Sequence, residues 1–173
     1  MRTTIVAIFV GLVLFAAAVP AEAKSDRWWL GGGIGLSFGD VDYIEVAPLV
    51  GFNATKKFSV GGGVLYRYRK DGRFEPSLST SDYGANVFAR YHITRPLFVQ
   101  GEYEYLNYEY IDFDTTERDE FNSFMVGPGY SQRIGNNASL FVMALYNFSY
   151  DSNDERSPYD DPWRLRVGVS FGF

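Results

Sequence analysis

The amino-acid sequence predicts an all-β fold, namely an eight-stranded antiparallel up-and-down transmembrane β-barrel. Apolar residues alternate with small, polar or charged residues in eight segments, which is the pattern of strands whose two faces meet different surroundings. Short and long polar connections alternate between these segments, as in a meander of hairpins. Aromatic residues make up 18% of the chain and include 13 Tyr, which suits the aromatic belts of a membrane barrel.

The N-terminal residues have the three parts of a secretory signal peptide. Arg2 supplies the positive charge, residues 5–19 form an uncharged apolar run of 15, and Ala21-Glu22-Ala23 fits the small–x–small pattern for cleavage. We therefore expect residues 1–23 to be a cleaved signal peptide and residues 24–173 to be a single barrel domain. An uncleaved anchor is the alternative, for which the apolar run is short.

The first four strands are expected at residues 29–38, 43–53, 58–70 and 81–92. Each sets large apolar side chains against glycine, polar or charged ones, and no helical pattern follows the signal peptide. The apolar face carries, in chain order, Leu30, Ile34, Leu36, Phe38, Ile44, Val46, Val50, Phe52, Phe58, Val60, Val64, Tyr66, Tyr68, Tyr83, Ala85, Val87, Ala89 and Tyr91.

The last four strands are expected at residues 97–110, 123–133, 139–150 and 163–173. Pro48 and Pro128 fit poorly, because a closed barrel has no edge strand for a proline, and we expect a β-bulge near Pro128. The apolar face continues with Leu97, Val99, Tyr103, Tyr105, Phe124, Val126, Tyr130, Leu140, Val142, Ala144, Tyr146, Phe148, Trp163, Leu165, Val167, Val169, Phe171 and Phe173.

The connections divide into two sets. Residues 53–57, 92–96 and 133–138 form short turns, whereas residues 70–81, 111–120 and 151–161 form longer polar loops, with a shorter member of that second set at 39–42. Of the 13 Tyr, 11 lie in the half of the barrel nearer the long loops, namely Tyr43, Tyr66, Tyr68, Tyr83, Tyr103, Tyr105, Tyr108, Tyr110, Tyr146, Tyr150 and Tyr159. We expect this asymmetry of an aromatic belt at one membrane interface.

Alternation alone does not say which face points inward, and a soluble lipocalin-like barrel also has about eight such strands. The glycine-rich face suits the crowded interior of a narrow barrel, and the aromatic-rich face suits lipid. The strands have the length needed to cross hydrocarbon when tilted. We therefore expect the apolar face to contact lipid.

The polar face then places charges in the lumen. An interior of about eight strands is just wide enough to be filled by side chains, and buried charges need partners. We expect a plugged lumen with a salt-bridge network, in which Glu104 pairs first with Arg166 and second with Arg67; a narrow, porin-like channel is the alternative. The proposed luminal charge network consists of Glu45, Arg67, Arg69, Arg90, Glu102, Glu104, Arg164 and Arg166.

Several classes of function are disfavoured. The net charge is −5, which argues against a nucleic-acid partner, and the chain has no cysteine for thiol chemistry. His92 is the only histidine and follows a strand at a short turn, so no nucleophile–base pair can be proposed beside it. We expect a protein that is not an enzyme and has no cofactor.

The two longest acidic connections, 111–120 and 151–161, hold ten acids and two Arg. They are either a solvated loop surface or a site for divalent cations. Their spacing does not match an EF-hand, so we assign no metal ligands.

The signal peptide, the eight amphipathic strands, the long outer loops and the terminal sequence LRVGVSFGF resemble the small outer-membrane β-barrel family of Gram-negative bacteria, which includes the OmpA transmembrane domain, OmpX and OmpW. The resemblance covers residues 24–173 and implies a structural or surface-interaction role in the outer membrane, in contact with lipid and lipopolysaccharide. It also implies that Val167, Val169, Phe171 and Phe173 form a signal read by the outer-membrane assembly machinery. The alternative is that the terminal aromatic is an interface residue only. An OmpW-like path for small apolar solutes is less consistent with a charged interior.

Overall fold

The computed structural model describes residues 27–37, 41–71, 78–112, 115–154 and 157–172. Within these ranges, no helix is long and apolar enough to cross a membrane. The strands are β1 (Trp28–Ser37), β2 (Val41–Asn53), β3 (Phe58–Asp71), β4 (Leu78–His92), β5 (Leu97–Asp112), β6 (Thr115–Arg133), β7 (Ala138–Asn147) and β8 (Trp163–Gly172).

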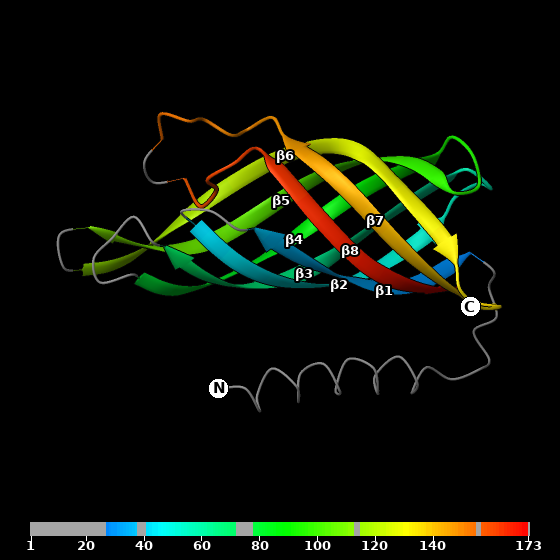
Figure 1. Ribbon diagram of the computed structural model, residues 1–173, viewed down its shortest axis with the longest axis horizontal. Coiled ribbons are helices and arrows are strands. Elements are labelled where there is room, and N and C mark those ends of the chain that lie inside the picture. Colours follow the sequence, from blue (N-terminus) through cyan, green and yellow to red (C-terminus); the bar gives the residue numbers. More distant parts are fainter. Residues whose placement is uncertain (1–26, 38–40, 72–77, 113–114, 155–156, 173) are drawn as a thin grey trace, which may run out of the picture.

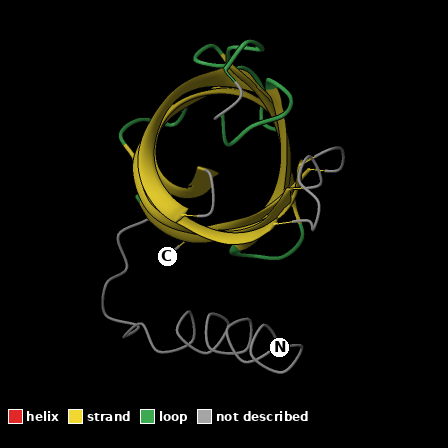
Figure 2. Cartoon of the chain, turned by 90° about the vertical axis from the view of Figure 1, so that its left-hand side faces the viewer, coloured by secondary structure: helices red, strands yellow, loops and turns green. Residues whose placement is uncertain are grey.

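These eight strands form one closed antiparallel barrel, as the sequence predicts (Figure 1). Each strand pairs with the next along the chain, and β1 closes the ring by pairing with β8. Ile34 of β1 lies opposite Val46 on one side and Val167 on the other. Viewed from the end with the longer connections, the strands surround a single lumen (Figure 2).

The apolar face of the strands points outward and the charged face points into the lumen, as the sequence predicts. Val64 and Val87 on the outside are 60% and 62% exposed, whereas Glu45 and Arg67 on the inside are 0% exposed. Large hydrophobic side chains on the outer surface and buried charges in the interior are the reverse of a water-soluble protein. This inversion is the pattern of a barrel that crosses a membrane.

Three short turns, at residues 54–57, 93–96 and 134–137, gather at one end of the barrel. We call this the periplasmic end, because small membrane barrels have short periplasmic turns and longer outer loops. Residues 148–162 connect β7 to β8 at the opposite, outer end.

The prediction of a long outer loop at residues 111–120 is wrong. β5 continues to Asp112 and β6 begins at Thr115, so the two strands extend as a ribbon beyond the other strands (Figure 1). Cross-strand polar pairs hold the ribbon, including a hydrogen bond of 2.9 Å from the Tyr110 hydroxyl to Glu117 and an ion pair between Glu109 and Arg118. Pairing of this kind needs no apolar face, which is why alternation did not identify the extension.

The two prolines interrupt the hydrogen-bonded ladders without shifting their register. β6 pairs with β7 at Met125–Asn147 and again at Gly129–Met143, with no added residue between. The expected bulge near Pro128 is therefore wrong. Pro48 likewise coincides with a gap in only one ladder, between β2 and β3, while its pairing with Gly32 of β1 continues.

Glycine makes room for aromatic rings inside the barrel. A Cβ atom added to Gly51 would lie 2.1 Å from Cε2 of Trp29, and one added to Gly129 would lie 2.1 Å from Cζ of Phe98. These contacts are far below van der Waals distance, so both positions require glycine while the rings keep their places.

Candidate functional site: the lumen

A neutral cluster of ionised side chains crosses the middle of the lumen. It has three carboxylates and three guanidinium groups, and each of the six side chains is at most 3% exposed. The residues come from β2, β3, β5 and β8 and are Glu45, Glu102, Glu104, Arg67, Arg164 and Arg166.

Glu45 is the centre of this cluster, because it contacts all three arginines. Its Oε2 accepts a hydrogen bond of 2.8 Å from Nη2 of Arg67 and another from Arg164. Its Oε1 accepts from Nη2 of Arg166 at 3.1 Å. One carboxylate from β2 therefore links β3 with β8, although β3 and β8 are not neighbours in the barrel.

Glu104 has a different partner from the one the sequence suggested. Arg164 donates to its two oxygens at 2.8 and 3.0 Å, whereas the nearest nitrogens of Arg67 and Arg166 are 3.6 and 3.9 Å away. The expectation that Arg166 is its first partner is wrong, because residue counts along tilted strands do not give the direction in which long side chains extend.

Glu102 connects the cluster to neutral polar side chains. Arg166 donates to its oxygens at 2.9 and 3.1 Å. Asn86 and Gln100 each donate from a side-chain amide at 2.8 Å. Gln100 in turn accepts a 2.9 Å hydrogen bond from Nε of Arg90, so Arg90 joins the cluster through an amide and not through an ion pair in the described structure.

Tyr159 closes the cluster from the outer side and was missed by the sequence analysis, which placed it in the lipid belt. It lies in the β7–β8 connection, yet it is buried and donates its hydroxyl to Glu104. The same hydroxyl accepts from Arg164 at 2.9 Å and from Arg67 at 3.1 Å. Tyr43 and Tyr108 are also buried in the lumen, so these three tyrosines do not belong to the belt.

Arg69 lies nearer the outer end than the central cluster. Its Nε donates to Asp82 at 3.2 Å, and Asp82 also accepts from the backbone N–H of Glu109 at 3.3 Å. Arg69 additionally donates to the carbonyl of Glu109. The eight luminal charges named from the sequence thus divide into the central six, Arg69 and Arg90, and Arg69 forms an ion pair with a ninth charge, Asp82.

Below the central cluster, apolar and aromatic side chains fill the lumen toward the periplasmic end. The guanidinium of Arg90 lies 4.3 to 5.6 Å from four ring centroids. Cation–π contacts of this kind stabilise a buried guanidinium that has few carboxylate neighbours. The sequence analysis treated the interior as charged and missed this layer, which consists of Trp29, Leu49, Phe88, Phe98, Met125, Phe141, Met143 and Leu145.

The terminal strand positions three of the four residues of the suggested assembly signal. Val167, Val169 and Phe171 are exposed on the outer face of β8, opposite Ile34, Gly32 and Leu30 of β1. Phe173 lies outside the described residues. The side chains of β8 therefore point alternately to lipid and to the lumen, where Arg164 and Arg166 take part in the cluster.

The outer connections show no metal site in the part of the chain that the structure describes, since no three acidic or histidine side chains are grouped there. Asp151 accepts hydrogen bonds of 2.9 and 3.0 Å from the backbone and side-chain amides of Asn153, and these bonds lower the pKa of that carboxyl. His92 is half-buried at the periplasmic end, with its ring 5.5 Å from that of Phe98.

A family model described as "Outer membrane protein beta-barrel domain" matches residues 7–173. The chain belongs to this family. This outer-membrane barrel protein is therefore an integral protein of the Gram-negative outer membrane, with the closed transmembrane fold described above. A comparison with curated protein sequences finds no match.

Solved structures with the same fold include three small barrels. Neisserial surface protein A is 16% identical, with a TM-score of 0.58, and the match covers 86% of this chain and 98% of that one. The N-terminal barrel of Pseudomonas aeruginosa OprF is 12% identical, with a TM-score of 0.57 and coverages of 86% and 98%. Yersinia pestis Ail is 12% identical, with a TM-score of 0.56 and coverages of 85% and 99%. At these identities the likeness concerns the fold alone.

Proposed function

We propose that this outer-membrane barrel has a structural or surface-interaction role, that its lumen does not conduct solutes, and that it is not an enzyme. The observation that carries the proposal is the neutral ion-pair cluster across the lumen. Three carboxylates balance three guanidinium groups there, and all six side chains are buried.

Two further layers support a closed lumen. The hydroxyl of Tyr159 binds the outer side of the cluster, and the rings around Arg90 fill the space on its periplasmic side. A solute would have to separate buried pairs, and breaking such a pair costs about 3–5 kcal/mol. The arrangement favours a plug over a water-filled path.

Single-channel recording in a planar bilayer tests this proposal. Protein from one refolded preparation is added to the bilayer, and its heat-dependent shift in gel mobility controls for folding. We expect no steady openings. Steady openings of uniform conductance would contradict the plugged lumen and favour the alternative role as a narrow channel for small solutes.

The proposed partners follow from the outer surface and the terminal strand. The exposed apolar face suits outer-membrane lipid and lipopolysaccharide, and Val167, Val169 and Phe171 with Phe173 suit recognition by the assembly machinery. Divalent cations remain a proposal for the acidic outer connections. They would bridge exposed carboxylates there to lipopolysaccharide phosphates, and chelation of these cations should then loosen lipopolysaccharide bound to the purified protein.

A further inference from the structure

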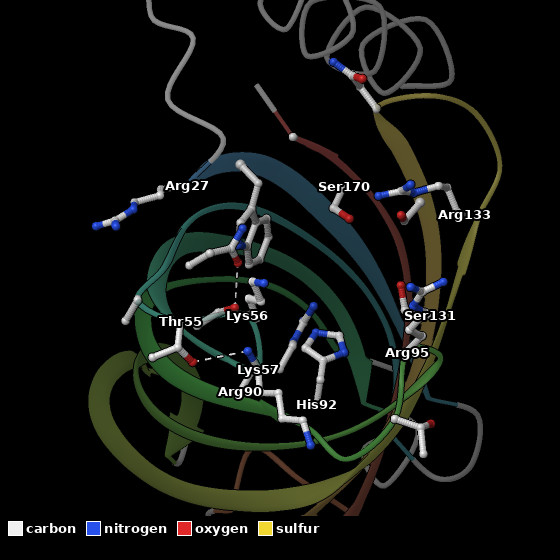
Figure 3. A pocket seen from close by; sticks show the side chains of 18 of the residues that line it. Arg27, Thr55, Lys56, Lys57, Arg90, His92, Arg95, Ser131, Arg133 and Ser170 are labelled. Carbon is white, nitrogen blue, oxygen red and sulfur yellow. Dashed lines mark hydrogen bonds between the residues drawn. The ribbon is translucent and has the colours of Figure 1, made fainter.

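A wide polar vestibule opens the barrel at its periplasmic end (Figure 3). Its volume is about 1190 Å³, and the three short turns and the adjoining strand ends form its wall. Its described lining contains no Asp or Glu, but it contains His92 and six cationic side chains, namely Arg27, Lys56, Lys57, Arg90, Arg95 and Arg133.

This concentration of positive charge is unusual for a chain of net charge −5. The nearest carboxylate of the central cluster, that of Glu102, is already bound by Arg166, Asn86 and Gln100. Among the described residues, none of the vestibule cations forms an ion pair with a carboxylate. Like charges gathered in a concave, partly desolvated site attract an anion more strongly than the same charges spread over a surface.

Arg90 supplies a second and independent indication of an anion. It lines the inner end of the vestibule and is 4% exposed. Its Nε is bound to Gln100, but its Nη2 is buried without a hydrogen-bond acceptor in the described part of the chain. A buried charged donor without a partner is costly, and an anion entering from the vestibule would supply the missing acceptor.

We propose that the vestibule binds a phosphate group that is esterified to a small polar moiety. A phosphate has the high charge density and the several acceptor oxygens that match guanidinium and ammonium groups. The cavity is much larger than a phosphate ion, and the neutral lining residues Asn53, Thr94, Ser131 and Asn137 can bind hydroxyl groups beside it. The phosphate would belong either to a phospholipid headgroup of the inner leaflet or to a soluble phosphate ester of the periplasm.

The first experiment uses the full barrel in nanodiscs of zwitterionic phosphatidylcholine, titrated with glycerol 3-phosphate and followed by calorimetry at low salt. The test variant carries Lys56→Gln, Lys57→Gln and Arg133→Gln, three exposed positions at which the fold should tolerate change. The control is Lys70→Gln, an exposed cation of β3 at the outer end. We expect the triple variant to bind about tenfold more weakly or worse, because it loses charge-assisted contacts, and the control to bind like the wild type.

The second experiment distinguishes a phospholipid headgroup from a soluble phosphate ester as the source of the phosphate. The thermal unfolding midpoint is compared between nanodiscs with and without phosphatidylglycerol, for the wild type, the triple variant and Arg90→Gln. Binding of glycerol 3-phosphate supports a soluble ester. Stabilisation by phosphatidylglycerol alone, lost in the variants, supports a lipid headgroup. The proposal is overturned if neither probe acts on the wild type, or if Lys70→Gln weakens binding as much as the triple variant. It does not depend on whether the lumen conducts.

Discussion

Replacing Glu104 with alanine removes one of the three carboxylates that balance the arginines in the lumen. Glu104 accepts two hydrogen bonds from Arg164 and one from Tyr159. The substitution leaves the buried cluster with one uncompensated positive charge, and breaking a buried pair in this way costs about 3–5 kcal/mol. Arg164 keeps its contact with Glu45, so we expect a cost near 3 kcal/mol, at the lower end of this range.

Double-mutant cycles identify the partner. Arg164 approaches Glu104 to 2.8 Å, whereas Arg166 approaches it only to 3.9 Å. We therefore expect a coupling free energy of about 2 kcal/mol between Glu104→Ala and Arg164→Ala, and one below about 1 kcal/mol between Glu104→Ala and Arg166→Ala.

The assay is reversible urea unfolding of the barrel from lipid vesicles, followed by tryptophan fluorescence. Glu120→Ala, at an exposed position of the β5–β6 ribbon, is the matched control and should change the unfolding free energy by less than about 0.5 kcal/mol. Additive costs for Glu104 and Arg164, or a near-neutral Glu104→Ala, would refute the reasoning, because a hydrated site would not need the pair.

Four other tests address separate parts of the structure. Val142→Arg on the lipid face should cost about 2–4 kcal/mol near the midplane, and Asn147→Ala on the inner face should cost less; equal costs in vesicle unfolding would mean that the faces are misassigned. Tyr159→Phe should lower the unfolding free energy by about 1–3 kcal/mol, since it leaves buried polar groups short of a partner; an unchanged urea midpoint would exclude the hydroxyl from the cluster. Gly51→Ala should cost about 1–3 kcal/mol by overpacking against a buried indole ring, and a stability equal to the wild type would show that the ring moves freely. Deleting Phe173 should reduce the heat-modifiable folded protein in outer membranes, and unchanged amounts there would argue that this residue is no assembly signal.

The number of strands, the closure of the barrel and the orientation of its two faces could be predicted because side chains along a strand alternate with a period of two. One buried or lipid-exposed face is enough to fix the parity of every side chain on it. That parity correctly placed Glu45, Arg67 and Arg164 inside the barrel. It also predicted that Val64 and Val87 would lie outside.

The remaining errors have physical causes. The ribbon from Thr115 carries polar residues on both faces, so it has no alternation to detect. Tyr159 is buried because its connection folds back into the outer mouth of the barrel, and an irregular segment has no period that would predict this. The pairing of Glu104 with Arg164 depends on strand tilt and on the reach of the guanidinium, which spacing along the chain does not give. The ring layer around Arg90 was missed because the inner face was described by its glycine, polar and charged residues, and its apolar residues, such as Phe98, were not considered.

The most direct test of the closed lumen is the exchange of arginine side-chain protons with water, measured by NMR on the barrel in nanodiscs with labelled guanidinium groups. Buried, hydrogen-bonded protons exchange slowly with water. We predict separate, slowly exchanging guanidinium N–H signals for Arg67, Arg164 and Arg166, all paired in the central cluster, and rapid exchange for Arg133, which is exposed at the periplasmic end. Rapid exchange of the three luminal arginines, at the rate of Arg133, would contradict a closed lumen and indicate a hydrated path through the barrel.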